Sequence, residues 1–408
     1  MPTLARDRLT WLTFTQLGVY GYFLYGFGPS VPLLRDELGV SNAISGLHGT
    51  ALAAGAVLAG VGWPVLAGRL GRPATLRLGL LGLTAGVLAY CLVPLLPVTL
   101  AGGLVCGFFG SLVVTGCTVV LAAHHGPAAP AAMSEANAVA AGTGLIAPLL
   151  VGAGVSAGLG WRPGMLVAAA VAVAVWVVSR RTGRAAGAAG AAGAGGPAEM
   201  APGAAPAGGD VEAAQDMPGR LPARYWLAWA VLVLCIGVEF AMTFWAADGL
   251  REHTGASPAA ATAGVTAIVA GMFAGRLGGG RVALRVRPAL LLLAAVGLTA
   301  AGFAGFWLST APLAALAGLA ACGLGISLQF PLGAALAVQA SGGRPDRGAG
   351  RVSFAAGLAS GVAPFALGAL ADRVGPHAAF LLVPVLLAGA AGCVVALLRT
   401  PAAEPAQV

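Results

Sequence analysis

Lysine is absent from this sequence of 408 residues, and charged residues of either sign are scarce. All 22 basic residues are arginines, and charged residues make up only 9% of the chain, whereas soluble domains contain about 25%. Because 58% of the residues are hydrophobic, too little polar surface remains to cover a fold in water. The lack of Lys also excludes the phosphate-binding G-x-x-x-x-G-K-[ST] loop. The composition therefore excludes a soluble domain and a P-loop ATPase.

Patterns that would indicate an enzyme or a metal site are also missing. The chain has no H-E-x-x-H sequence, and its six cysteines form no C-x-x-C pair, which argues against zinc and disulfide frameworks. One G-x-S-x-G match, Gly154–Gly158, falls at the end of an apolar run, whereas the catalytic motif requires a turn from a strand into a helix. We expect no enzyme activity, no cofactor and no metal.

Long apolar runs are what the chain has instead. A bilayer core of about 30 Å requires roughly 20 apolar residues per helix. Such runs predict membrane spans at 10–34, 42–67, 75–95, 98–122, 132–157, 163–179, 225–248, 257–276, 288–309, 311–339, 350–371 and 376–398. The predicted fold is all-α, with twelve transmembrane helices in two pseudo-symmetric six-helix bundles.

The placement of arginine predicts the orientation in the membrane. If the N-terminus is cytoplasmic, eighteen arginines lie in cytoplasmic segments, and only Arg35, Arg162, Arg251 and Arg373 lie outside. Basic residues favour the cytoplasmic side. We therefore expect a multi-pass protein of the cell membrane with both termini in the cytoplasm. The net charge of +8 is then explained by contact with anionic lipid, and no basic patch on a soluble face indicates nucleic-acid binding.

A change of composition divides the chain. Residues 183–222 are rich in Ala, Gly and Pro and have no apolar periodicity, which is typical of a flexible linker. The predicted organisation is an N-terminal bundle at 1–182, a cytoplasmic linker at 183–222, a C-terminal bundle at 223–400 and a cytoplasmic tail at 401–408.

The two predicted bundles share sequence features. The phrase Ala-Gly-Arg-Leu-Gly occurs at 67–71 and again at 274–278, an offset of 207, each time near the end of an apolar run. At an offset of 216, Pro148 matches Pro364 and Gly107 matches Gly323. Membrane transporters are often built from such repeats, with the substrate held between them. The repeats therefore predict a protein that opens alternately to the two sides of the membrane.

These residues resemble the major facilitator superfamily. The loop between the second and third helices of that family typically reads G-x-L-A-D-R-x-G-R-R. Residues 66–72, Leu-Ala-Gly-Arg-Leu-Gly-Arg, keep most of this pattern, but Gly68 replaces the acid, and the copy at 274–278 has Gly275 at the same place. The resemblance implies the twelve-helix fold, packing of the fifth helix on the eighth, and packing of the eleventh on the second.

The missing acid leaves the cytoplasmic gate to other residues. In the family, that acid helps to hold the cytoplasmic side shut. We predict that Glu135 takes its place and pairs with Arg276 when the protein faces outward, with Arg69, Arg72 and Arg351 at the corresponding helix ends. The alternative is that Glu135 is a solvated carboxylate that suits a helix N-terminus.

Glu239 is the most informative single residue because it lies in the middle of a predicted span. An acid at a helix centre costs about 2.5–3.5 kcal/mol on insertion scales, so it should face a cavity. We interpret Glu239 as a group that couples protons or contacts substrate, the alternative being a protonated structural carboxyl. The softer cavity candidates are Gln16, Tyr22, Tyr25, His48 and Gln329. For each of them, a polar side chain bonded between packed helices is the favoured interpretation over substrate contact.

The predicted function is secondary active transport by alternating access. The expected partners are a small neutral or cationic solute, protons and membrane lipid, and the chain is expected to be monomeric. Neutral or cationic solutes are favoured because no arginine is clearly placed within a predicted span. The alternative is a transporter-derived receptor or assembly partner that binds a solute without moving it.

Overall fold

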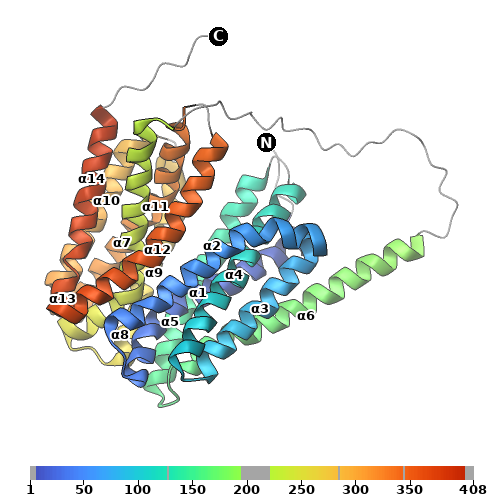
Figure 1. The fold of residues 1–408 in the computed structure, drawn as a ribbon, viewed down its shortest axis with the longest axis horizontal. Helices are drawn as coiled ribbons and strands as arrows, with labels where there is room; N and C mark the ends of the chain where they lie inside the picture. Colours follow the sequence, from blue (N-terminus) through green and yellow to red (C-terminus); the bar gives the residue numbers. More distant parts are fainter. Residues whose placement is uncertain (1–5, 126–127, 194–220, 284, 343–344, 400–408) are drawn as a thin grey trace, which may run out of the picture.

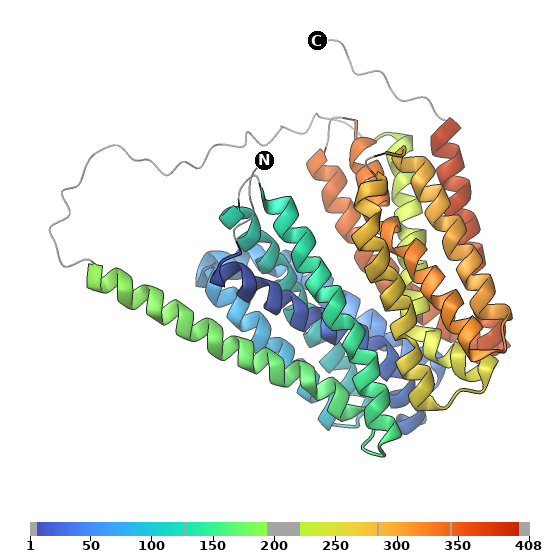
Figure 2. The ribbon, with the colours of Figure 1, turned by 180° about the vertical axis from the view of Figure 1, so that it is seen from behind.

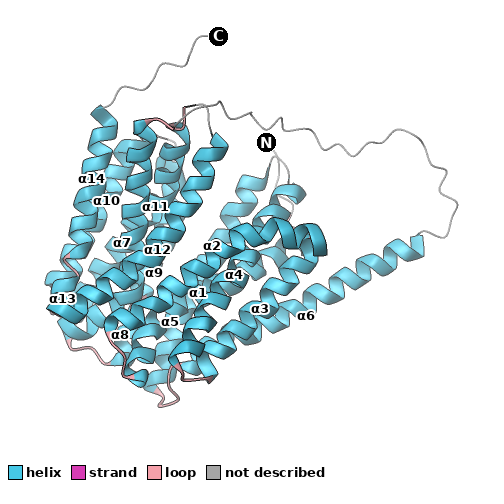
Figure 3. Cartoon of the chain, viewed as in Figure 1, coloured by secondary structure: helices cyan, strands magenta, loops and turns pink. Residues whose placement is uncertain are grey.

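Every regular element that the computed structural model describes is an α-helix (Figure 3). The described residues are 6–125, 128–193, 221–283, 285–342 and 345–399. The first half contains α1 (Arg8–Leu38), α2 (Asn42–Leu70), α3 (Arg72–Leu92), α4 (Leu96–His125), α5 (Ala129–Ser156) and α6 (Arg162–Gly193). The second half contains α7 (Ala223–Thr254), α8 (Pro258–Gly264), α9 (Thr266–Ala283), α10 (Pro288–Leu308), α11 (Pro312–Gln339), α12 (Pro345–Val374), α13 (Pro376–Ala379) and α14 (Leu382–Arg399).

These elements confirm the twelve predicted spans. Two spans are each interrupted once, between α8 and α9 at Val265 and between α13 and α14 at 380–381. The second interruption has a covalent cause, because Pro384 has no N–H to donate to the carbonyl of Phe380. Eleven of the spans in the described residues are long and apolar enough to cross a membrane. The exception is α1, whose hydropathy is lowered by Gln16 and three tyrosines.

The two halves repeat the same packing. In the first half α4 packs against α2 and α3, and in the second half α11 packs in the same way against α9 and α10. The closest helix contacts are the same in the two halves. A Cβ atom on Gly107 would lie 1.9 Å from the carbonyl oxygen of Leu52, and a Cβ atom on Gly323 would lie 2.0 Å from the carbonyl oxygen of Ile268. Both pairs are related by the offset of 216, which is therefore the structural register of the repeat.

The halves meet through three sets of helices. The packing of α2 against α12 and of α5 against α8 and α9 follows the expectation from the family resemblance, and α1 also packs against α7. Figures 1 and 2 show the halves side by side and converging toward one end. We call this the closed end; there α1 and α7 terminate and α2 and α8 begin. Away from it, α2 and α12 expose large apolar side chains, including Val61, Val65 and Phe354, so the halves separate toward the opposite end.

The boundary between the first half and the linker differs from the predicted one. Helix α6 continues to Gly193, past the boundary predicted at 182. Residues 194–220 of the predicted linker and the predicted tail at 401–408 lie outside the described residues.

Candidate functional site

A small pocket lies between the two halves near the middle of α1 and α7. It is lined by residues of α1, of α7 and of the break between α8 and α9: Leu24, Tyr25, Gly28, Pro29, Glu239, Phe240, Thr243, Phe244 and Val265. Its walls come from both halves, so a rearrangement of the halves must change its shape. That is the geometry expected of a binding site in a two-bundle transporter.

Glu239 contributes the carboxyl group of this pocket. Its backbone carbonyl accepts a hydrogen bond from Thr243 Oγ1 at 2.8 Å, and its side chain is half-buried. The structure therefore places Glu239 on a wall of a pocket to which both halves contribute. Its role in proton coupling or substrate contact stays a prediction.

Arg276 and Tyr25 lie beside Glu239. Arg276 Nη1 donates a hydrogen bond to Tyr25 Oη at 3.3 Å, across the interface between the halves, and its guanidinium interacts electrostatically with Glu239. Tyr25, Glu239 and Arg276 come from α1, α7 and α9. A hydroxyl, a carboxylate and a guanidinium thus converge between the halves. The pocket has a volume of about 20 Å³, room for about one water molecule, so a solute fits there only after the halves rearrange.

The position of Arg276 corrects one inference from the sequence. The phrase at 274–278 is not the structural counterpart of the phrase at 67–71, because the structural offset is 216 and not 207. The counterpart of Arg69 is Arg285, whereas Arg276 lies inside α9, about 10 Å before its end at a rise of about 1.5 Å per residue. A cation therefore does lie within a span, and the sequence-based reason for favouring neutral or cationic solutes no longer holds.

Four other predicted cavity residues make contacts inside a single half. In the first half, Tyr22 donates to the carbonyl of Gly164 at 2.6 Å, His48 lies 3.0 Å from Thr99 Oγ1, and Gln16 accepts from Cys117 Sγ at 3.8 Å. In the second half, Gln329 donates to Thr299 Oγ1 at 2.7 Å. All four side chains are buried, and these contacts match the packing alternative. Of the softer candidates, Tyr25 is the one whose contact crosses between the halves.

The predicted gate residues do not meet in this conformation. Glu135 forms an ion pair with Arg6 of its own half at 2.6 Å, while Arg276 contacts Tyr25. Arg351 lies over the ring of Trp226, 5.0 Å from its centroid. The gate was predicted for an outward-facing state, in which the halves would approach each other at the end opposite the closed end. For that state the gate stays a prediction.

Arg69 and Arg72 are the remaining gate candidates. Arg69 lies at the end of α2 and Arg72 at the start of α3, and both side chains are exposed. No ion pair within the described part of the chain includes either residue. The structure thus leaves both arginines available to a partner in another conformation.

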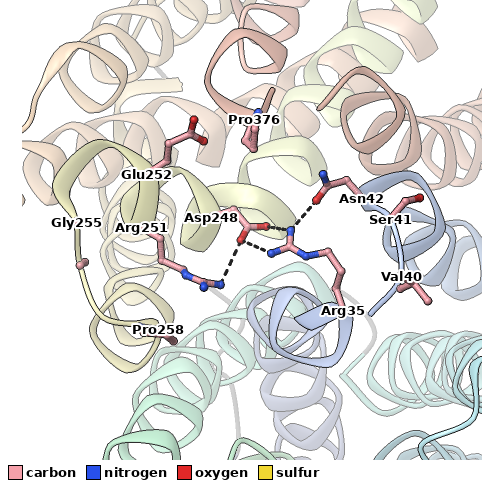
Figure 4. Close-up of a pocket in the computed structure, with 11 residues that line it drawn as sticks. Arg35, Val40, Ser41, Asn42, Asp248, Arg251, Glu252, Gly255, Pro258 and Pro376 are labelled. Carbon is pink, nitrogen blue, oxygen red and sulfur yellow. Dashed lines mark hydrogen bonds and ion pairs between the residues drawn. The ribbon is translucent and has the colours of Figure 1, made fainter. Parts of the chain in front are cut away.

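The closed end carries a charge network that the sequence analysis missed (Figure 4). Arg35 of α1 forms an ion pair with Asp248 of α7 at 2.8 Å and donates to Asn42 of α2 at 2.7 Å. Arg251 of α7 pairs with Asp36 of α1 at 2.7 Å. Each half therefore supplies one arginine and one acid to the other, and the network holds the halves together.

Two further acids stabilise the same end. Asp372, in the last turn of α12, accepts hydrogen bonds from the backbone amides of Asn42 and Ala43, both at 2.8 Å. A carboxylate at a helix N-terminus is favourable because it satisfies free N–H groups and the helix dipole. Within the first half, Glu37 pairs with Arg162 at 2.5 Å.

The repeat did contain a signal for this network. At the offset of 216, Arg35-Asp36-x-x-Gly39 matches Arg251-Glu252-x-x-Gly255. Both glycines adopt positive φ, 63° and 65°, and end α1 and α7. The matched pattern marks two equivalent helix ends. It does not reveal that Arg35 pairs with Asp248, which lies 213 residues away.

No metal site is evident in the described residues, where no group of three or more His, Cys, Asp or Glu side chains could hold an ion. The central pocket and the charge network are two polar arrangements that connect the halves. One offers groups that can bind a solute, and the other offers contacts that must break if the closed end opens.

Comparisons with known proteins agree with this architecture. The model of the Major Facilitator Superfamily matches residues 13–247 and again residues 227–408. No curated protein matches the sequence. Among solved structures, the fold is similar to a bacterial homologue of the human lysosomal transporter Spinster in an inward-facing and occupied conformation. That structure has a TM-score of 0.69 and 15% identity, and the match covers 98% of both chains.

The inward-facing and unoccupied structure of a bacterial Spinster homologue is also similar, with a TM-score of 0.66, 15% identity, and coverage of 97% of this chain and 96% of the other. At this identity both likenesses show the fold alone. The family model, in contrast, matches nearly the whole chain and matches it as two halves. The chain belongs to the major facilitator superfamily and is a multi-pass membrane transporter.

Proposed function

We propose that this protein moves a small solute across the cell membrane by alternating access, coupled to protons through Glu239. The observation that carries the proposal is the convergence of Glu239, Arg276 and Tyr25 from three helices at the interface between the halves. A carboxyl group there can take up a proton in one conformation and release it in the other. Because Arg276 lies beside Glu239, a solute that binds to Arg276 changes how strongly Glu239 holds its proton.

The conformation supports a proposal for which end of the molecule faces the cytoplasm. The halves are joined at the closed end by ion pairs and separate toward the end where α1 begins and α14 ends (Figure 1). Because arginines are concentrated at that second end, the positive-inside tendency favours placing it in the cytoplasm. We therefore propose an inward-facing state with both termini cytoplasmic.

The charge of the solute is left open by this proposal. Arg276 favours an anionic group, Glu239 favours a cationic one, and the pair together suits a neutral or zwitterionic solute. A thermal-shift screen of the purified protein against metabolites and drugs, at two pH values, selects solutes for transport assays. Binding of a solute to the folded protein raises the melting temperature by mass action.

Transport and its coupling are tested in proteoliposomes with the selected solute under an imposed pH gradient. The wild-type protein should show solute flux that follows the gradient. Glu239→Gln keeps the size of the side chain but cannot ionise, so flux should persist at most weakly and lose its dependence on the gradient. Glu252→Gln, the same change at an exposed position of α7, serves as the matched control and should behave as wild type.

A pH-dependent flux that is unchanged in Glu239→Gln would contradict the coupling role. The second candidate function, a receptor or assembly partner, is distinguished by the same preparation: solute binding without any flux under every gradient would favour it over transport.

A further inference from the structure

An apolar groove lies on the second half, away from the central pocket. It has a volume of about 300 Å³, at the lower end of the range for ligand pockets, about 300–1,000 Å³. Helices α9, α10 and α11 line it with small and aliphatic residues: Ala274, Gly275, Gly278, Val282, Leu291, Ala294, Ala295, Leu298, Leu324, Gly325 and Leu328. We call it the α9–α11 groove.

The first half shows that the same space can be filled by the protein itself. At the offset of 216, Gly62 and Phe108 correspond to Gly278 and Leu324. A Cβ atom on Gly62 would lie 3.2 Å from Phe108 Cζ, whereas one on Gly278 would have no atom within 4 Å. The shorter Leu324 leaves open the space that the phenyl ring of Phe108 covers. The groove is therefore a feature of one half and not a consequence of the fold.

Cationic groups lie at one end of the groove. Arg285 and Arg287 are exposed in the turn between Val282 and Leu291, which both line it. No ion pair among the described residues uses either guanidinium. The turn leads into the N-terminus of α10, which has no side-chain cap. Free N–H groups at a helix N-terminus favour a phosphate, and so do neighbouring arginines.

We propose that the α9–α11 groove binds one acyl chain of an anionic phospholipid, with the lipid phosphate held by Arg285, Arg287 and the start of α10. The α9–α11 groove ends at two arginines that form no ion pair among the described residues, in the turn between two membrane helices, and so matches both parts of such a lipid. Aliphatic lining suits the chain, and the clustered positive charge selects an anionic headgroup. This site does not depend on which solute the central pocket binds.

The test uses the full-length protein, purified in detergent and stripped of lipid. Native mass spectrometry then follows the binding of phosphatidylglycerol and, as a neutral probe with similar chains, phosphatidylcholine. One phosphatidylglycerol should bind more tightly than phosphatidylcholine. Leu324→Phe, which copies Phe108, should weaken that binding about tenfold, the loss expected when roughly two methylene groups are no longer buried.

The headgroup is tested separately. The double variant Arg285→Gln/Arg287→Gln should remove the preference for phosphatidylglycerol and leave the binding of phosphatidylcholine unchanged. Equal binding of the two lipids by the wild-type protein would overturn the headgroup assignment. Undiminished binding to Leu324→Phe would overturn the acyl-chain assignment.

The complementary change keeps the proposal testable if Leu324→Phe does not fold. Phe108→Leu opens the corresponding space in the first half, where Arg69 and Arg72 lie at the equivalent turn. This variant should bind a second phosphatidylglycerol. A variant that binds no additional lipid would show that open space next to cationic groups is insufficient, which would contradict the proposal.

Discussion

At the scale of single residues, most arginines on the side of the membrane that the overall bias disfavours form ion pairs with carboxylates. Of the four arginines that the sequence placed against the overall arginine bias, Arg35, Arg162 and Arg251 have a carboxylate partner in the structure, and Arg373 has no ion pair among the described residues. A charge in the membrane region is costly unless it is paired. The exceptions to the positive-inside tendency are therefore the arginines to examine first for structural ion pairs.

Asp7, just before α1, gives a prediction at this scale. Its carboxylate accepts hydrogen bonds from the backbone N–H and the hydroxyl of Thr10, at 2.9 and 2.7 Å, and lies 2.8 Å from His124. These contacts, chiefly the backbone hydrogen bond, lower the pKa of Asp7 to about 2. A lowered folded-state pKa stabilises the protein above the ordinary pKa near 4, and that stabilisation is lost as the pH falls through 2.

Asp7→Ala should therefore lower the melting temperature at pH 7, where loss of an N-cap costs about 1 kcal/mol. The difference from the wild-type protein should shrink as the pH falls from 4 toward 2. Thermal unfolding at a series of pH values measures it. A difference that does not change with pH would mean that the charge of Asp7 contributes nothing.

At the scale of helices, close packing depends on matched glycines. Gly107 of α4 and Gly323 of α11 each face a backbone carbonyl of a neighbouring helix, in α2 and α9, so closely that a methyl group at either position would overlap the carbonyl oxygen. Glycine permits this approach because it has no Cβ atom. Since both contacts have the same geometry, the two halves should respond alike to the same substitution.

Gly107→Ala and Gly323→Ala should each destabilise the protein by about 1–3 kcal/mol, because the added methyl group forces the helices apart. Gly60→Ala on α2, where a Cβ atom would meet nothing within 4 Å, is the control and should be neutral or slightly stabilising. Thermal unfolding in detergent compares the three. Tolerance of alanine at only one of the two sites would contradict equivalent packing.

The whole molecule is held in its present conformation by contacts between the halves at the closed end. Asp248, which is largely buried, receives Arg35 from the other half, and Asp372 caps α2 from the other half. A conformation that opens this end must break both sets of contacts. In the proposed alternating-access cycle, the balance between the two states therefore depends on these residues as well as on the solute.

Asp248→Asn should shift that balance toward opening of the closed end, since hydrogen bonds to charged groups are worth about 1.5–3 kcal/mol. Spin labels at Leu159→Cys and Leu313→Cys, two exposed positions of different halves, report the separation by pulsed electron paramagnetic resonance. Longer distances should become more populated.

Glu37→Gln is the matched control, because it removes an ion pair whose two partners lie in the same half. It should leave the distance distribution unchanged. An equal shift in both variants would show that the effect is a general loss of stability and not a release of the interface.

The sequence by itself determined the membrane environment, the twelve spans and the twofold repeat. These follow from the apolar length that a bilayer demands and from a residue pattern that recurs at a fixed offset. The sequence was also sufficient to select Glu239 as a candidate residue, because an acid in an apolar run is costly wherever the helix packs.

Only the tertiary structure decided which side chains meet. Arg69 and Arg276 occur in the same five-residue phrase and both are exposed, yet Arg69 lies at a helix end, whereas Arg276 lies inside α9 and contacts Tyr25 of the other half. The phrase is local, whereas depth in the membrane is set by the register of the whole helix against its neighbours. Pairs such as Arg35 with Asp248 depend on packing between distant segments, and no pattern along one helix contains that information.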